Sequence, residues 1–201
     1  TSTADGIAFA TQITLQGTDA VVLTSAGGAG DDIVLGTDRT TDVLGGGQAL
    51  TLNSGALGDI TVNGDVGAAG AGRLGAVTIT NAENATFNGT VTAASFTQNA
   101  GAATGTTTFE QLVDLSGAFA FTGQNLTING VGNNAVGTTM TVTNAGTFTT
   151  ADTAALVVGN EFIQNGAGAN VIGGNITSTA DGIAFATQIT LQGTDAVVLT
   201  S

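Results

Sequence analysis

Apolar and small polar residues alternate along most of the chain, in runs of four to six residues. A period of two with many β-branched residues is typical of half-buried strands. Asn-Gly, Gly-Gly and Ser-Gly pairs lie between the runs and supply the positive φ angles of tight corners. The clearest runs are 50–53, 60–63, 77–80, 118–121, 126–129, 140–143 and 189–192. Residues 109–115 have a hint of helical spacing, but the run is short and is interpreted as strand or corner.

The chain repeats itself on two scales. Residues 1–25 are identical to residues 177–201, an offset of 176 (177 − 1). The motif at Phe96 recurs at Phe162, an offset of 66, and residues 78–82 recur in similar form after 63. Since 66 is three times 22, 63 is three times 21 and 176 is eight times 22, these offsets predict a coil of roughly 20–22 residues.

The long repeat predicts the domain organisation. We interpret residues 1–176 as one full tandem repeat unit and residues 177–201 as the start of the next identical unit; an artificially duplicated end is the alternative. On the first interpretation the chain is a piece of a longer precursor, which would continue after Ser201 with a sequence like Ala26–Asp32. Residues 177–201 should then repeat the conformation of 1–25, displaced along the stacking axis.

Short strands, Gly and Asn corners and a period near 22 predict an all-β fold. We expect a parallel β-solenoid, a right-handed β-helix, with about eight coils per 176-residue period. The chain has no Pro, which fits strands that donate to a ladder along their length. A pair of β-sandwich domains is the competing architecture, but the chain lacks the Trp and Tyr that often fill their cores. The side chains expected to fill the core instead are Phe87, Phe96, Phe109, Phe119, Phe121, Phe148 and Phe162.

The composition excludes several classes of function. There is no Cys or His, so disulfides, zinc fingers, haem ligation and Ser-His-Asp catalysis are excluded. Arg39 and Arg73 are the only cations against 15 acidic residues, a net charge of −13, which repels nucleic acid and anionic membranes. No apolar run is long enough for a membrane-spanning helix. We therefore expect no enzyme activity, no organic cofactor, no nucleic-acid partner and no membrane insertion by this segment.

A resemblance to a known class of proteins is carried by strings such as LGAVTITNAENATFNGTVTAASFTQNAG and TSAGGAGDDIVLGTD. The sequence resembles the β-strand repeats of giant exported bacterial surface proteins. These are the filamentous-haemagglutinin-like and autotransporter-like adhesins and fibres. The resemblance covers essentially the whole chain and rests on motifs of low specificity. It implies an extracellular location at the bacterial cell surface and a structural role as fibre, sheath or stalk. An adhesin module that presents one solenoid face to glycans or other cells is the alternative. The partners would be neighbouring repeats of the same chain and other copies in a fibre.

The best local motif is Gly27-Gly28-Ala-Gly30-Asp31-Asp32, which matches the nonapeptide that binds Ca²⁺ in β-rolls. Asp38 and Asp42 follow closely, and hard carboxylate oxygens suit Ca²⁺. The equivalent Gly-rich turn that begins at Gly45 has no Asp. A calcium site formed by Asp31, Asp32, Asp38 and Asp42 is therefore one interpretation. A solvated acidic corner, with Arg39 as a local counter-charge, is the other and the favoured one.

Closely spaced threonines are a second candidate. Ice-binding solenoids present such hydroxyl arrays once per turn at one register. The gaps between the pairs here are irregular, which favours ordinary strand threonine chosen for β-propensity. The groups are Thr78/Thr80, Thr106/Thr108, Thr139/Thr141/Thr143 and Thr147/Thr149.

Overall fold

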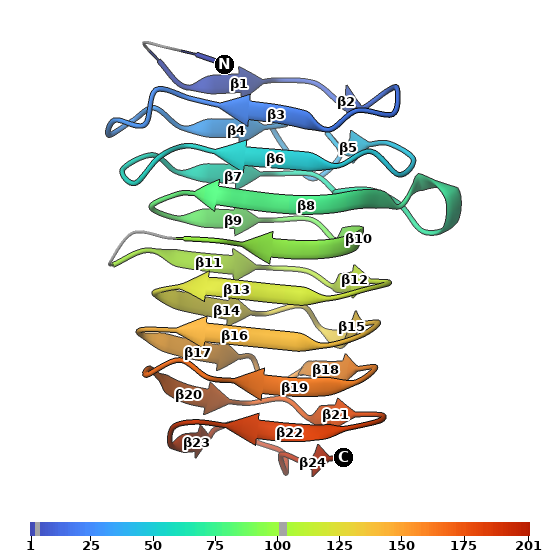
Figure 1. The fold of residues 1–201 in the computed structure, drawn as a ribbon, viewed down its shortest axis with the longest axis vertical. Coiled ribbons are helices and arrows are strands. Elements are labelled where there is room, and N and C mark those ends of the chain that lie inside the picture. Colours follow the sequence, from blue (N-terminus) through green and yellow to red (C-terminus); the bar gives the residue numbers. More distant parts are fainter. Residues whose placement is uncertain (3–4, 101–103) are drawn as a thin grey trace.

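The strands run parallel and stack turn upon turn, so that each strand pairs with the equivalent strand of the previous and the next turn (Figure 1). The structure is a computed structural model that describes residues 1–2, 5–100 and 104–201. Each turn places up to three strands on three faces, which we number 1 to 3 in chain order. The described strands complete eight turns and two faces of a ninth. The predicted all-β solenoid of about eight coils is confirmed.

Face 1 is a nine-stranded sheet that receives one short strand from every turn. Its strands are β1 (Ile7–Phe9), β4 (Ile33–Leu35), β7 (Ile60–Val62), β9 (Ala85–Phe87), β11 (Thr106–Phe109), β14 (Asn125–Ile128), β17 (Thr147–Thr150), β20 (Ala169–Ile172) and β23 (Ile189–Leu191).

Faces 2 and 3 are joined by one long strand, β10 (Val91–Gln98), whose first residues pair on face 2 and whose last residues pair on face 3. The other strands of face 2 are β2 (Ile13–Thr14), β5 (Val43–Leu44), β12 (Val113–Leu115), β15 (Gly132–Val136), β18 (Ala154–Val158), β21 (Ile176–Ser178) and β24 (Leu199–Thr200). The other strands of face 3 are β3 (Val21–Thr24), β6 (Leu50–Asn53), β8 (Leu74–Asn81), β13 (Phe119–Gly123), β16 (Met140–Asn144), β19 (Glu161–Gln164) and β22 (Gly182–Phe185). Between β5 and β10, single bridges at Val66 continue face 2.

The turns differ in length more than the sequence predicts. On face 1, Ile7 pairs with Ile33, Ile33 with Ile60, and Ile60 with Ala85, so the sequence offsets are 26 (33 − 7), 27 (60 − 33) and 25 (85 − 60). The offsets of the later turns are 22, 19, 22, 22 and 19. The expected coil length is therefore wrong for the first three turns, which are longer. The ladder fixes the strands but leaves the corners free to take extra residues, such as the 3-10 turn η1 (Gly70–Gly72) before β8.

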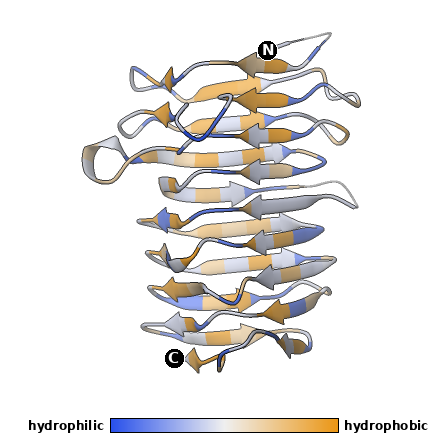
Figure 2. Ribbon diagram, turned by 180° about the vertical axis from the view of Figure 1, so that it is seen from behind, coloured by the Kyte–Doolittle hydropathy of each residue, from blue (hydrophilic) through white to orange (hydrophobic). Residues whose placement is uncertain are grey.

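The interior is mainly apolar, with some buried polar side chains, among them Asn144, Gln164 and Asn170, which hydrogen-bond to one another. Strand residues alternate between buried and partly exposed positions, and hydrophobic residues cover most strands, while many of the connecting corners are hydrophilic (Figure 2). The seven phenylalanines predicted to fill the core are each at most 1 % exposed. Their rings pack between turns: Phe87 and Phe109 stack with centroids 5.1 Å apart, and Phe96 and Phe119 do the same at 5.1 Å. Aromatic rows thus supply the large core side chains, as predicted.

The two identical segments form the same kinds of strand on different faces. The first copy places β1, β2 and β3 on faces 1, 2 and 3. The second copy places β22, β23 and β24 on faces 3, 1 and 2. The second copy therefore lies seven turns and two faces after the first. The copy is displaced along the axis, as expected, and it is also rotated by one face, which was not predicted.

Among the described residues no helix is long and apolar enough to cross a membrane. The described helical structure is the three-residue turn η1.

Candidate functional site

Three of the four acidic residues of the candidate calcium motif lie at two corners on either side of β4, and Asp38 lies between these corners. Asp31 and Asp32 come directly before β4, and Asp42 comes directly before β5 on the next face. Asp31 accepts a hydrogen bond from the backbone N–H of Gly28 at 2.6 Å. This bond closes the Gly-rich turn upon itself.

Asp38 lies in the exposed loop between the two corners. Its Oδ1 accepts bonds from the Thr40 hydroxyl at 2.7 Å and the Thr40 N–H at 2.8 Å. These two bonds hold the pKa of the Asp38 carboxyl below its ordinary value. Arg39 is exposed, and the ion pair that the described residues form uses Arg73 instead.

Within the described part of the chain, no three Asp or Glu side chains come together in a group that could hold a metal ion. Asp32 and Asp42 each bind a backbone N–H of the following turn: Asp32 that of Asp59 at 2.8 Å, and Asp42 that of Asp65 at 3.0 Å. Calcium binding by Asp31, Asp32, Asp38 and Asp42 stays a prediction. The hydrogen bonds of Asp32 and Asp42 to the following turn indicate that these two residues join successive turns.

Asp32 begins a column of polar residues that continues down the corner before face 1. We call Asp32, Asp59, Asn84, Thr106, Asn125 and Thr147 the corner ladder; each directly precedes the first inward residue of its strand. Asp59 Oδ1 accepts the N–H of Asn84 at 3.0 Å and its side-chain amide at 2.9 Å. Asn84 Oδ1 in turn accepts the N–H of Thr106 at 3.0 Å. Side-chain acceptors thus extend the backbone ladder to a corner that the strands leave open.

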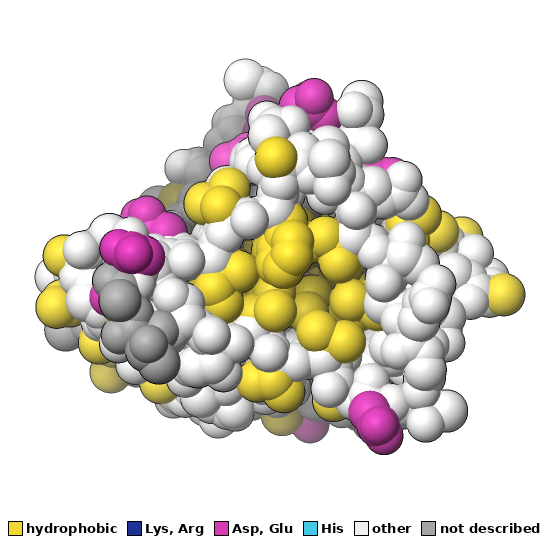
Figure 3. All heavy atoms as spheres, turned by 90° about the horizontal axis from the view of Figure 1, so that it is seen from above, with side chains coloured by type: hydrophobic (Ala, Val, Ile, Leu, Met, Phe, Trp, Pro, Cys, Tyr) yellow, Lys and Arg dark blue, Asp and Glu magenta, His cyan; other side chains and the backbone are white. Residues whose placement is uncertain are grey.

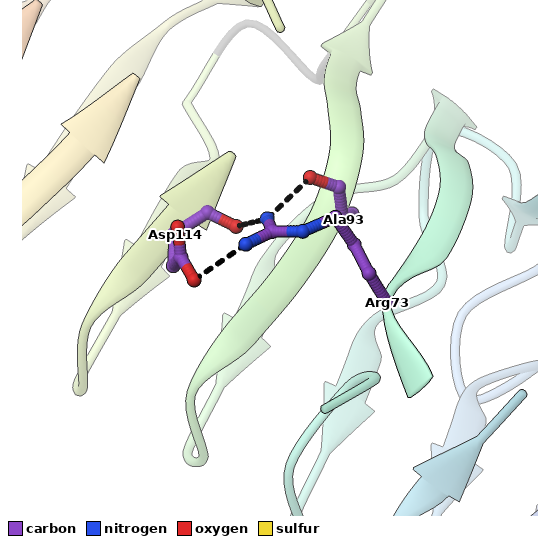
Figure 4. A network of polar contacts seen from close by, with 3 residues as sticks. All are labelled: Arg73, Ala93 and Asp114. Atoms are coloured by element: carbon purple, nitrogen blue, oxygen red, sulfur yellow. Dashed lines mark hydrogen bonds and ion pairs between the residues drawn. The ribbon is translucent and has the colours of Figure 1, made fainter. Parts of the chain in front are cut away.

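One of the two cations, Arg73, makes polar contacts with a residue 41 positions further along the chain, Asp114 (Figure 4). Its Nη1 donates to the carbonyl oxygen of Ala93 at 3.0 Å and to that of Asp114 at 2.6 Å, while Nη2 reaches the Asp114 carboxylate at 2.7 Å. The guanidinium therefore crosses β10 and joins three successive turns. The side chains of Arg73 and Asp114 are 23 % and 41 % exposed, so solvent weakens the attraction between their two charges.

A column of threonines occupies the outer side of face 1. Strand pairing places one threonine from each of five consecutive turns in the same register. These partly exposed residues are Thr61, Thr86, Thr108, Thr127 and Thr149. Successive turns in a parallel ladder lie ~4.8 Å apart, so the hydroxyls form a regular row. Of the threonine groups named from the sequence, Thr108 and Thr149 lie in this row, whereas Thr78 and Thr141 lie on face 3, so those groups do not share one register. The row on face 1 was not predicted; it forms because the corners absorb the differences in turn length.

Comparison with protein-family models, with curated proteins and with solved structures found no match. The interpretation of these features therefore depends on their geometry.

Reasoning from the sequence missed the corner ladder and the reach of Arg73. Members of the ladder are unequally spaced along the chain and change among Asp, Asn and Thr, so no fixed spacing shows them. A usable signal does exist: a polar residue precedes the inward residue of each of these face 1 strands, as in Asp32-Ile33 and Asn125-Leu126. Arg73 and Asp114 are 41 residues apart, and nothing local marks them as partners.

Proposed function

We propose that this chain is a structural repeat of a long extracellular fibre, sheath or stalk on a bacterial surface. The observation that carries the proposal is the identity of residues 1–25 and 177–201, both of which form a coil within one continuous stack. A solenoid whose sequence starts again before the stack ends is suited to indefinite extension. The excess of acidic over basic residues would keep neighbouring fibres from clumping sideways.

Two further features support a mechanical role over a chemical one, and two others bear on the location. The polar contacts described above, in the corner ladder and around Arg73, join one turn to the next. Seven of the nine phenylalanines, the large aromatic side chains that a glycan site would use, are packed in the core instead. The resemblance to exported β-strand repeats adds the surface location, and the absence of Cys fits a chain exported through an oxidising compartment.

The proposal predicts that length grows in equal steps. Chains with one, two and three 176-residue units, each followed by residues 1–25, should appear in electron micrographs as rods. Each unit should add about 37 Å, since each turn of a parallel ladder adds ~4.8 Å. Antibodies against the repeat should also label intact cells of the source bacterium. Beads on flexible linkers, or labelling only after lysis, would contradict the proposal.

An adhesin module is the second candidate function, and the threonine column of face 1 is the observation that favours it. A regular row of hydroxyls on a parallel sheet offers repeated hydrogen-bonding groups to a carbohydrate chain. Replacing Thr86, Thr108 and Thr127 by Val preserves the strand shape and removes the hydroxyls. Loss of binding to host cells or a glycan array in this triple variant, with an unchanged circular dichroism spectrum, would support adhesion. Replacement of Thr78, Thr97 and Thr141 on face 3 by Val is the matched control.

A further inference from the structure

The two identical copies are covered on opposite sides. The first copy pairs with the turn that follows it, through β1 with β4, β2 with β5 and β3 with β6. The second copy pairs with the turn that precedes it, through β22 with β19, β23 with β20 and β24 with β21. One structure therefore shows both neighbours of the same sequence.

The apolar side chains of the two copies show the same complementarity. Phe9 is 42 % exposed in the first copy, whereas its equivalent Phe185 is half-buried, with its ring 5.1 Å from that of Phe162. Conversely, Leu15 is 6 % exposed, whereas its equivalent Leu191 is 57 % exposed. At these two positions each copy leaves uncovered what the other copy has covered.

The open side of the first copy is a broad apolar surface. Viewed along the axis from this end, hydrophobic side chains fill the middle, and acidic side chains lie towards the rim (Figure 3). The partly buried side chains of Ile7, Ile13, Val21 and Leu23 pack on the core here. No described strand pairs with this side of β1. We call this side of β1, β2 and β3 the leading edge.

We propose that the leading edge binds residues 161–176 of a preceding copy of this sequence, in the register that the second copy already shows. In that register Phe162 pairs with Ile183, Asn170 with Ile189 and Ile176 with Leu199. Ile183, Ile189 and Leu199 are equivalent to Ile7, Ile13 and Leu23, 176 residues earlier. In the proposed contact, Phe162, Asn170 and Ile176 of the preceding copy therefore lie opposite these three residues of the leading edge. The proposal rests on the tandem-fibre function above and adds its stacking geometry.

The geometry has a defined rotation. The first copy begins with β1 on face 1. The same residues of the second copy form β22, which lies on face 3 next to β19. Each unit therefore contributes seven turns and two faces, and the next unit is rotated by one face around the axis. Three successive units bring the sequence back to its original face. The threonine column would accordingly wind around the fibre instead of following one side.

Engineered cysteines can test this register, because the chain has no Cys of its own. Residues 157–176 are placed directly before Thr1 of the full chain, which recreates the junction between two units. One cysteine replaces Ile163 of the added segment and the other replaces Ala8. Both positions lie outside the core: Ala8 and its equivalent Ala184 are exposed, and Ile163, which pairs with Ala184, is partly exposed. Paired positions in adjacent strands suit a disulfide.

We expect rapid, near-complete disulfide formation between position 163 of the added segment and position 8. The matched control moves the first cysteine to Val171 of the added segment, which would lie opposite position 8 if units stacked without rotation. This control should form little or no intramolecular disulfide. Crosslinking of the control in preference to the 163 pair would overturn the rotation.

Amide hydrogen exchange gives a second readout that needs no disulfide. Exchange in β1 should slow by at least tenfold when the added segment is present, and a segment of the same composition in scrambled order should leave it unchanged. Unchanged exchange with the native segment would overturn docking at the leading edge. These outcomes are independent of the cellular location: a chain found inside the cell would refute the surface fibre and leave the crosslink intact.

Discussion

Arg73 and Asp114 lie two turns apart and are joined by a 2.7 Å ion pair that passes over β10. The same guanidinium also donates to two backbone carbonyl oxygens, so it joins three turns beside the point where β8, β10 and β12 pair. We expect Arg73→Ala to lower the free energy of unfolding by about 1 kcal/mol, because partial exposure reduces the worth of charged hydrogen bonds. Urea unfolding would measure the change. Asp114→Asn, which keeps the carbonyl acceptors, should cost less; an equal or larger loss would contradict this account.

The aromatic rows should carry much of the stability. Phe109 is fully buried and packs against Phe87 and Phe96, with ring centroids 5.1 Å away in each case. Phe109→Ala should cost about 3–5 kcal/mol, as for other buried phenylalanines. Phe9→Ala and Phe185→Ala form a matched pair with the same local sequence. Thermal unfolding should show the larger effect for Phe185, which lies against Phe162; equal effects would mean that the two copies have the same surroundings.

The corner ladder should depend on acceptors and not on charge. Asp59→Ala removes the acceptor for two donors of Asn84 and should cost about 1–2 kcal/mol. Asp59→Asn keeps an acceptor and removes one negative charge beside Asp32, so its stability should match that of the parent chain to within about 0.5 kcal/mol. The comparison is made by urea unfolding at pH 7. A destabilised Asn variant would show that the negative charge itself is required.

Acid should release the loop that follows β23. Asp152 accepts bonds from the Thr194 N–H at 3.0 Å and the Thr194 hydroxyl at 2.9 Å, and these bonds hold the pKa of Asp152 below its ordinary value of 3.8. A lowered folded pKa means that the contact stabilises above pH 3.8 and is lost as the pH falls through the lower value. The amide resonance of Thr194 should therefore titrate below pH 3.8. In Asp152→Asn this titration should disappear, and a Thr194 shift that persists would assign it to another group.

Calcium titration separates the two interpretations of the Gly-rich acidic segment. The carboxylates of Asp32 and Asp42 lie at separate corners and already accept backbone N–H donors. We expect calorimetry with Ca²⁺ to give the same trace for the parent chain and for Asp32→Asn, which keeps the hydrogen bond to Asp59. Saturable heat in the parent that Asp32→Asn abolishes would instead establish the site.

The sequence predicted the architecture well, but it did not predict the contacts between individual side chains. Alternation identified the strands, and residues 109–115 do form the end of β11 and the whole of β12, as interpreted. The buried phenylalanines followed from the lack of other large aromatic residues. Turn length could not be predicted, because residues in the corners carry no periodic signal: the segment between Val66 and Leu74 adds a loop without changing the faces. The rotation of the second copy depends on the sum of those corner lengths, so it was beyond reach as well.

Unequal turns have a visible consequence for a filament built from this chain. The first three turns are longer than the turns that follow them, and the loop around η1 projects sideways beyond the strands (Figure 1). Every period would therefore begin with a swelling and taper to a slimmer shaft. Because the taper runs in one direction only, the outline of a single filament in a micrograph would reveal its polarity, and the swellings would count its units.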